Sequence, residues 1–224
     1  MDALLLLKFT NLFSKLSAED FVKNILVEKI GAREIMMGRG FAFGKKKLGD
    51  ISFLRQLNKK YGFVVTELQM AKSSGMLISS TRIRKLIING KIAKASKLLG
   101  RPVSILGTVK RGAKMGRILG YPTANINPHH EAIPPSGVYA VLVRFNKKTF
   151  GGVLNIGRRP TFYEYSEPTI EVHVFNFKKF IYNKDLEIEF VEKIRDEKRF
   201  PNRAGLIDRI GLDEKRAKKI LNMI

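Results

Sequence analysis

Hydrophobic and polar residues follow two different patterns along this chain, and the pattern changes near residue 100. In the first part, short apolar runs alternate with segments whose apolar positions recur at helical spacing. The expected order is a buried strand at 3–9, a helix from Ser17 to Gly31, a strand at 34–37, a helix from Asp50 to Tyr61 and a strand at 63–68. This alternation predicts a parallel sheet flanked by helices.

Residues 83–99 predict two short helices separated by Gly90, and the sequence Gly100-Arg101-Pro102 marks the expected boundary. Beyond it, apolar runs alternate with turns rich in Gly, Pro and Asn. The expected strands are 103–109, 138–145, 149–156, 169–177 and 186–190, followed by terminal helices at 206–210 and 213–223. Strands without intervening helices predict an antiparallel barrel. We therefore expect two domains, 1–100 and 101–224.

Composition indicates a globular protein with an unusually basic surface. The chain has 224 residues, of which 44% are hydrophobic and 28% charged, and its formal net charge is +22. Such a charge attracts phosphorylated ligands, nucleic acid or acidic membranes, yet Lys and Arg are dispersed over the whole chain, which argues against a specific nucleic-acid footprint. The absence of cysteine excludes disulfides and favours the cytoplasm. The apolar run Ala3–Leu7 is too short for a membrane span and lacks a basic flank.

The stretch from Gly107 to Asn127 reads G-T-V-K-R-G-A-K-M-G-R-I-L-G-Y-P-T-A-N-I-N and carries the strongest chemical signal. We expect three glycines to allow positive φ and to let a ligand approach the backbone, while basic side chains supply positive charge. The glycines are Gly112, Gly116 and Gly120, and the basic residues are Lys110, Arg111, Lys114 and Arg117. The threonine and asparagine of Pro122-Thr123-Ala124-Asn125 offer the hard oxygen ligands that Mg²⁺ accepts. The stretch suits a polyphosphate, although on spacing alone a solvated hairpin is the commoner meaning of such a loop.

A candidate general base lies in the segment T-I-E-V-H-V at 169–174. The period of two puts Ile170, Val172 and Val174 on one face, and Glu171 with His173 on the other. By itself this pattern favours a solvent-facing carboxylate, with Glu187 and Glu189 as its equals. We interpret His173 as a packed ring outside the site, and His129 and His130 as surface residues without a metal partner.

The string G-x-V-x-x-G-x-x-x-G-R-x-L-G-Y-P-T-A-N resembles the nucleotide-binding signature of riboflavin kinases, and T-I-E-V-H resembles the strand that carries their catalytic base. The resemblance implies an antiparallel barrel that phosphorylates riboflavin to FMN with ATP. It implies that Glu171 is the base, and that Thr123 and Asn125 hold Mg²⁺ and the nucleotide phosphates. The implied nucleotide-binding residues are Gly107, Lys110, Gly112, Gly116, Arg117, Gly120, Pro122, Thr123 and Asn125.

Two further segments match the same family. Residues 155–161 follow its N-x-G-x-R-P-T turn, and residues 194–200 resemble its L-R-D-E-K-x-F segment. The resemblance implies a flavin pocket formed by Asn155, Gly157, Arg159, Pro160, Thr161, Arg195 and Phe200. Without the family match, these segments read as a glycine/proline turn and a solvated, charged helix end.

The first half resembles the adenylyltransferase part of bacterial bifunctional riboflavin kinase/FMN adenylyltransferases, also called FAD synthetases. The matching strings are S-A-E-D-F-V, G-R-G-F-A-F-G-K-K-K-L-G-D and I-S-S-T-R-I-R. The resemblance implies a nucleotidyltransferase-like, Rossmann-like sheet. Hydroxyls at a helix start followed by arginine can hold phosphate on Ser79, Ser80, Thr81 and Arg82, although ordinary N-capping explains the same residues.

The family's H-x-G-H motif is missing, because the histidines are His129, His130 and His173 alone, and Gly40 stands where the family commonly has Asp or Asn. We therefore expect a partial adenylyltransferase with little or no FAD synthesis. One alternative is a longer native N-terminus with both activities. The others are a flavin-binding scaffold without turnover and a basic, OB-like nucleic-acid-binding protein, which leaves P-T-A-N and T-I-E-V-H unexplained.

Overall fold

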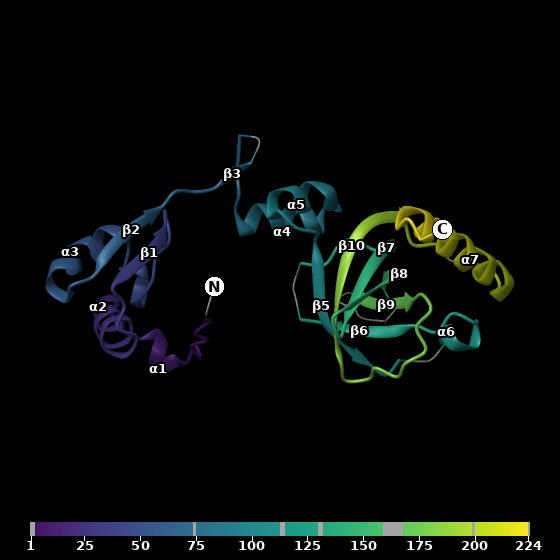
Figure 1. The fold of residues 1–224 in the computed structure, drawn as a ribbon, viewed down its shortest axis with the longest axis horizontal. Helices are drawn as coiled ribbons and strands as arrows, with labels where there is room; N and C mark the ends of the chain where they lie inside the picture. The colour runs from purple at the N-terminus through teal and green to yellow at the C-terminus, as the bar shows by residue number, and fades with distance from the viewer. Residues whose placement is uncertain are drawn as a thin grey trace. The chain divides into compact units, whose positions relative to one another are not determined.

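The computed structural model describes residues 3–73, 75–112, 115–129, 132–158, 168–198 and 200–223. The chain forms two compact units, Met1–Leu77 and Ile78–Ile224 (Figure 1). Each unit has a hydrophobic cluster of its own.

The N-terminal unit combines short helices with small sheets. Its elements are α1 (Asn11–Ser14), α2 (Ala18–Asp20), the π-helix η1 (Phe21–Lys29), β1 (Glu34–Gly38), the 3₁₀ turn η2 (Lys45–Lys47), α3 (Ile51–Tyr61), β2 (Val64–Leu68), β3 (Lys72–Ser73) and β4 (Met76–Leu77). The α3 helix has the expected ends, since the Asp50 carboxylate accepts from the Phe53 amide at 2.8 Å and Gly62 adopts a left-handed φ of 71°.

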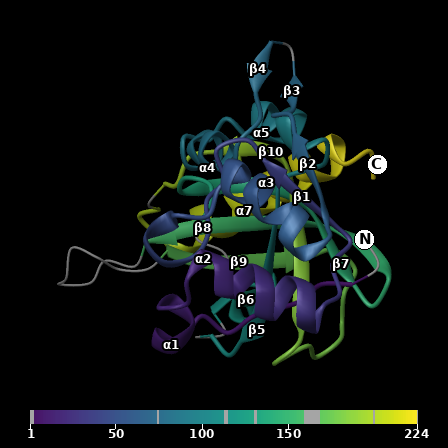
Figure 2. The same ribbon diagram turned by 90° about the vertical axis from the view of Figure 1, so that its left-hand side faces the viewer.

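Strands β1 and β2 pair in parallel, as the alternation of strands and helices predicted, while β3 and β4 form an antiparallel hairpin (Figure 2). The buried core of this unit is small. It consists of Val22, Met37, Leu54, Leu57 and Phe63.

The prediction of a buried strand at 3–9 is wrong. These residues form no strand, and their side chains are exposed, with Leu6 at 83% and Phe9 at 78% exposure. In the described part of this unit, β1 and β2 pair only with each other, and residues 3–9 add to neither edge of that sheet. Phe9 instead stacks edge-on against Phe13, with ring centroids 5.7 Å apart.

The second unit is a closed barrel with helices outside it. Its elements are α4 (Ser80–Ile88), α5 (Ile92–Leu99), β5 (Ser104–Lys110), α6 (Met115–Ile118), β6 (Ala124–Pro128), β7 (Gly137–Phe145), β8 (Lys148–Arg158), β9 (Pro168–Val174), β10 (Asp185–Arg195) and α7 (Arg203–Ile220). The six barrel strands follow the order β10-β5-β6-β9-β8-β7, and every pair is antiparallel. The predicted antiparallel barrel is confirmed.

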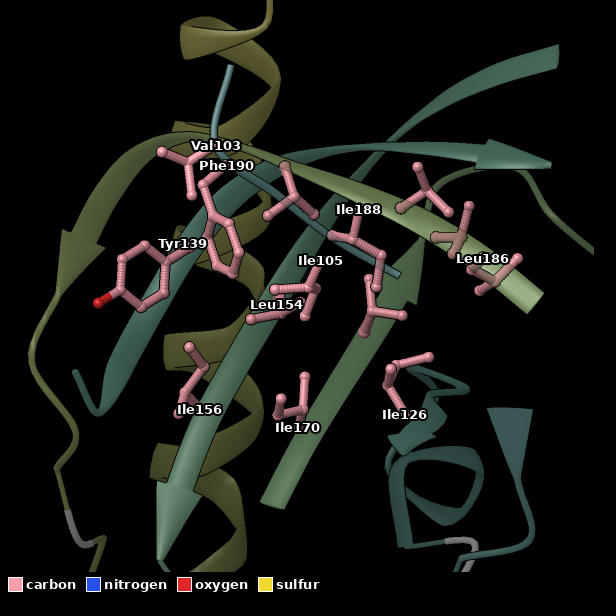
Figure 3. Packing of buried hydrophobic residues seen from close by; sticks show 14 of the residues in the cluster. Val103, Ile105, Ile126, Tyr139, Leu154, Ile156, Ile170, Leu186, Ile188 and Phe190 are labelled. Carbon is pink, nitrogen blue, oxygen red and sulfur yellow. The ribbon is translucent and has the colours of Figure 1, made fainter. Parts of the chain in front are cut away.

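Large aliphatic side chains fill the barrel interior (Figure 3). Tyr139 is fully buried among them, and its hydroxyl donates to the Pro135 carbonyl at 2.6 Å. Burial raises the pKa of Tyr139 to about 12. Helices α4 and α5 add Ile87, Ile92 and Ala95 to this core. For this reason the compact unit begins at Ile78, ahead of the boundary expected at residue 100.

Helix α7 lies along the outside of strands β7, β8 and β10 (Figure 1). Its Ala217 packs with Val138, Ala140, Phe175 and Ile194 in a second cluster on that surface. The two terminal helices expected at 206–210 and 213–223 are a single helix, because Gly211 continues the α-helical path instead of ending it. The helix forms one wall of the pocket described next.

Candidate active site

Three polar residues lie side by side on three adjacent strands. Asn125 on β6 is directly opposite Glu171 on β9, and Glu171 is directly opposite Asn155 on β8. Directly paired residues point to the same face of a sheet. The alternate positions Ile170 and Val172 are buried in the barrel, so the three polar side chains occupy its outer face. The predicted alternation along β9 is confirmed.

The segment that precedes β6 brings a hydroxyl to this row. Thr123 Oγ1 lies 3.4 Å from Glu171 Oε2, a separation longer than that of an ordinary hydrogen bond between two oxygens. His173 Nδ1 lies 2.8 Å from the Pro122 carbonyl oxygen. The sequence interpretation left His173 outside the site. Its position on the Glu171 face of β9 was the available signal, but only the structure brings it against the P-T-A-N segment.

Glu171 differs in its surroundings from the two carboxylates that sequence alone could not separate from it. Glu189 is 7% exposed and forms an ion pair with Arg144 at 2.8 Å. Glu187 accepts a hydrogen bond from the Ser104 hydroxyl at 3.0 Å. Glu171 instead lines the pocket beneath α7.

The glycines of the loop serve close packing more than unusual φ values. A Cβ on Gly112 would collide with the Asn125 side-chain amide, and a Cβ on Gly116 would collide with the Tyr121 carbonyl. Neither glycine has positive φ, whereas Gly120 does, at 85°. The expectation of positive φ is therefore wrong for two of the three, because the loop folds back on its own side chains. Gly107 likewise lies against Ile126 and the Asn127 carbonyl.

The loop's charged residues are distributed around this packed backbone. Lys110 ends β5 with an exposed side chain, and the Arg111 guanidinium lies 5.7 Å from the centre of the Tyr182 ring. Arg117 belongs to α6, and Pro122 is exposed just before Thr123. Lys114 lies outside the described residues.

A pocket of about 300 Å³ lies between α7 and the outer face of the barrel. Its walls come from β8 and β9, from Leu206, Ile210 and Asp213 of α7, and from two loop regions. The loop residues that line it are Gly116, Leu119, Tyr121, Thr123, Arg195, Glu197, Lys198 and Phe200. Glu171, Asn155 and His173 all line it. Its volume is at the lower end of the range for small-molecule sites.

Four of the seven residues expected to bind flavin are described by the structure. Asn155, Arg195 and Phe200 line the 300 Å³ pocket. Gly157 lies nearby on β8, where a Cβ would come within 2.6 Å of a Glu197 carboxylate oxygen. Arg159, Pro160 and Thr161 lie outside the described residues.

Arg195 is engaged in a buried ion pair. Its Nε donates to both Asp213 oxygens, at 3.1 and 2.9 Å, and its Nη2 lies 2.7 Å from Asp213 Oδ2. Arg209, one turn earlier in α7, contacts Asp213 Oδ1 at 3.2 Å. Asp213 is 2% exposed, and the Arg195 guanidinium also lies 5.7 Å from the centre of the Phe200 ring. The pair joins the end of β10 to α7 and so fixes two walls of the pocket.

A second pocket of about 310 Å³ opens on the other side of Thr123, which lines both. Most of the side chains that line it are apolar or aromatic, including Phe177, Phe180 and Tyr182. Lys178 and Lys179 also line it. The threonine of P-T-A-N therefore lies at the junction of two pockets.

The Ser-Ser-Thr-Arg segment forms the start of α4. Ser79 caps the helix by accepting from the Arg82 amide at 3.3 Å, and Ser80 is the first helical residue. Ser79, Thr81 and Arg82 line a shallow hollow with Lys85, Asn89 and Lys91. The N-capping interpretation is confirmed, and phosphate binding stays a prediction.

Within the described ranges, no three His, Asp or Glu side chains gather in a way that could hold a metal ion. Near Glu171, the Thr123 hydroxyl and the side-chain amides of Asn125 and Asn155 offer oxygens to a cation. Also within the described part of the chain, no helix is long and apolar enough to cross a membrane.

Comparison with known proteins agrees with this geometry. The riboflavin kinase family model matches residues 99–221, and the FAD synthetase family model matches residues 1–82. The bifunctional riboflavin kinase/FMN adenylyltransferase of Buchnera aphidicola from Schizaphis graminum is 42% identical over 228 residues, which cover 100% of this chain and 73% of that protein. The Escherichia coli K12 protein of the same name is 33% identical, over 100% of this chain and 71% of its own length.

Among solved structures, a Streptococcus pneumoniae protein described as a macrolide-efflux protein superimposes with a TM-score of 0.75 at 30% identity, over 94% of this chain and 67% of its own. The kinase model covers the barrel and the FAD synthetase model covers the N-terminal unit, so the chain belongs to the bifunctional riboflavin kinase/FMN adenylyltransferase family and contains its riboflavin kinase domain with part of its FAD synthetase domain.

Proposed function

We propose that the barrel unit transfers the γ-phosphoryl group of ATP to the terminal ribityl hydroxyl of riboflavin, with Glu171 as the general base. The observation that carries the proposal is the position of Glu171 in one pocket, 3.4 Å from a hydroxyl that lines both that pocket and the next. A base must lie within reach of the hydroxyl proton it accepts. The two substrates must also meet at one point, and Thr123 marks that point.

The two pockets suit the two substrates. The pocket beneath α7 has an apolar wall from Leu206 and Ile210 and polar groups at Glu171 and Asn155, which suits a flat ring carrying a polyol chain. The second pocket offers aromatic rings for a base and Lys178 and Lys179 for phosphates. We therefore assign riboflavin to the first pocket and the adenosine end of ATP to the second.

Mg²⁺ fits the side-chain oxygens next to Glu171. Mg²⁺ prefers hard oxygen ligands and is usually held by few protein groups together with substrate phosphates. Thr123 and Asn125 would hold it, and the ion would offset negative charge on the phosphates. The packing of Gly112 against the Asn125 amide fixes one of these ligands from behind.

The proposed transfer forms one bond to phosphorus, breaks another and moves one proton. The ribityl oxygen forms a bond to the γ-phosphorus, the bond from that phosphorus to the β–γ bridging oxygen breaks, and ADP leaves with the electron pair. The hydroxyl proton moves to Glu171. Asn155 and Asn125, on either side of Glu171, help to orient the hydroxyl and the phosphates.

The variant Glu171→Gln tests the assignment. We expect kcat for FMN formation to fall by about 10²–10⁴-fold, the usual contribution of a general base, with an unchanged melting temperature. Glu192→Gln is the matched control, because Glu192 is an exposed carboxylate of β10 whose contact with Arg216 is 3.8 Å long. Turnover by Glu171→Gln equal to that of the control would remove Glu171 from the mechanism.

We also propose that this polypeptide forms FMN with little or no FAD. The histidines of the H-x-G-H motif are absent from the sequence, which removes groups that stabilise charge on the nucleotide phosphates. Incubation with riboflavin, ATP and Mg²⁺, followed by chromatography, separates the products. FMN alone supports the proposal, and accumulation of FAD overturns it. The cytoplasm stays the proposed compartment, in accord with the absence of cysteine.

A further inference from the structure

His173 makes one polar contact that defines its chemistry. Its Nδ1 lies 2.8 Å from the carbonyl oxygen of Pro122. A carbonyl oxygen only accepts, so Nδ1 carries the hydrogen and donates it. The contact therefore joins β9 to the segment before β6.

The ring is held in place from two sides. Tyr121 packs against it edge-on at 5.6 Å between centroids, and Phe175 does so at 5.9 Å. Tyr121 is fixed in turn, because its amide donates to the Gly116 carbonyl at 2.8 Å and its hydroxyl lies 3.2 Å from the position of a Cβ on Gly211 in α7. These ring contacts restrict the rotation of the imidazole and keep its donor aimed at one acceptor.

Pro122 and Thr123 lie just before a strand and outside its regular backbone pairing. Strand β6 begins at Ala124, so the two residues lie outside the sheet ladder. Proline has no N–H, which leaves its carbonyl as its single backbone hydrogen-bonding group. The His173 side chain supplies the partner for that carbonyl, one peptide before the threonine whose hydroxyl lies next to Glu171.

We propose that His173 is a positioning residue that holds the Pro122–Thr123 peptide so that the Thr123 hydroxyl stays at the junction of the two pockets. The proposal rests on the function proposed above. His173 and Glu171 are two residues apart on one face of a strand, a spacing of about 7 Å between their Cα atoms, so the tie acts on the nucleotide side of the site and not on the base itself.

A matched pair of variants isolates the hydrogen bond from the ring. His173→Asn places an amide nitrogen directly on Cγ, where Nδ1 is attached, whereas His173→Gln carries its amide one atom further out. Both variants lose the imidazole and its aromatic contacts. They differ in whether a donor can reach the Pro122 carbonyl.

We expect His173→Gln to raise KM for ATP about tenfold relative to His173→Asn, the effect of losing one hydrogen bond. The two variants should bind riboflavin equally in a fluorescence titration without nucleotide, because each removes the same part of the pocket wall. Equal KM values for ATP in the two variants, or a larger value for His173→Asn, would overturn the proposal.

A second measurement separates this inference from the kinase assignment. In the wild-type protein, ¹⁵N-resolved NMR of the histidine rings should give a His173 Nδ1–H that is slow to exchange, and His173→Asn should melt above His173→Gln. If no FMN forms but these signs are present, the kinase assignment fails while the tie stands. A fast-exchanging Nδ1 overturns the positioning role, whatever the turnover.

Discussion

The two units of this chain bury their hydrophobic residues very differently. The barrel closes on itself, so each strand has two neighbours, and its interior is filled by aliphatic side chains at 0–2% exposure such as Ile105, Leu154 and Ile188. In the N-terminal unit one parallel strand pair is covered by a five-residue core, and Leu4–Leu7 remain exposed. Parallel sheets normally have both faces covered, and a lone pair of strands is marginal.

This difference indicates which of the two units can hold catalytic side chains in fixed positions. In the barrel, fixed cross-strand register aligns Asn125, Glu171 and Asn155, and the closed core holds that register in place. In the N-terminal unit the glycine-rich loop after β1 is exposed, and a Cβ on Gly38 or Gly40 would meet nothing within 4 Å. A rigid scaffold is what allows side chains to be held at productive distances.

The largest expected effect contrasts the two cores. Leu154→Ala should lower the free energy of unfolding of the barrel by about 2–5 kcal/mol and reduce FMN formation, because Leu154 is fully buried among strands that carry the site. Leu54→Ala, at a 1% exposed position in α3, should loosen the N-terminal unit and leave turnover unchanged. Denaturant unfolding with amide exchange checks both. Loss of turnover in Leu54→Ala would show that the units depend on each other.

Gly112→Ala should reduce kcat/KM for ATP about 10²-fold, since its Cβ would displace the Asn125 amide and misplacement of a positioning group by about 1 Å has that order of effect. Gly38→Ala in β1 is the control from the other unit, because its Cβ would enter open space. Steady-state kinetics at varied ATP concentration measure kcat/KM for both variants. Equal kinetics for the two variants would mean that the Gly112 packing has no role in binding the nucleotide.

Asp213→Asn should cost about 1–3 kcal/mol of barrel stability, because it leaves the Arg195 charge with a neutral partner in a place where the side chain is 16% exposed. It should also raise KM for riboflavin more than KM for ATP, since Asp213 fixes the pocket beneath α7. Asp208→Asn, at an exposed position of the same helix, serves as the control. A variant with normal stability and normal flavin affinity would contradict the anchoring role.

The smallest effect concerns the exposed Glu19–Lys60 pair of the N-terminal unit, whose charged groups are 2.7 Å apart. The pKa of Glu19 is lowered by hydrogen bonds from Lys60 and Tyr61 and by the Lys60 charge. The small contribution of this pair to the stability of the N-terminal unit is therefore fully present above the ordinary pKa of a glutamate. It is lost as the pH falls through the lowered pKa of Glu19. Acidification should lower the amide-exchange protection factors around α3, which correct for the intrinsic pH dependence of exchange, more in the wild type than in Lys60→Gln. High salt should remove the difference.

Several elements were predictable because their signals lie within a few neighbouring residues. Helix α3 begins after Asp50 and ends at Gly62 as expected, since capping and left-handed φ are local properties. The alternation at 169–174 correctly separated the buried face of β9 from the face that carries Glu171. The succession of strands without helices indicated the barrel.

Other features depended on contacts between residues distant in the chain. The run at 3–9 has the composition of a strand but pairs with no strand in the described structure. Gly211 continues the helix α7, which packs on the barrel strands, and the Tyr121 hydroxyl lies beside it. The approach of Thr123 to Glu171 joins residues 48 positions apart. The sequence by itself determined which faces are apolar and which residue types are present. Only the tertiary structure decided that Thr123, Glu171 and His173 meet, because strand register and loop packing are set by the closed core as a whole.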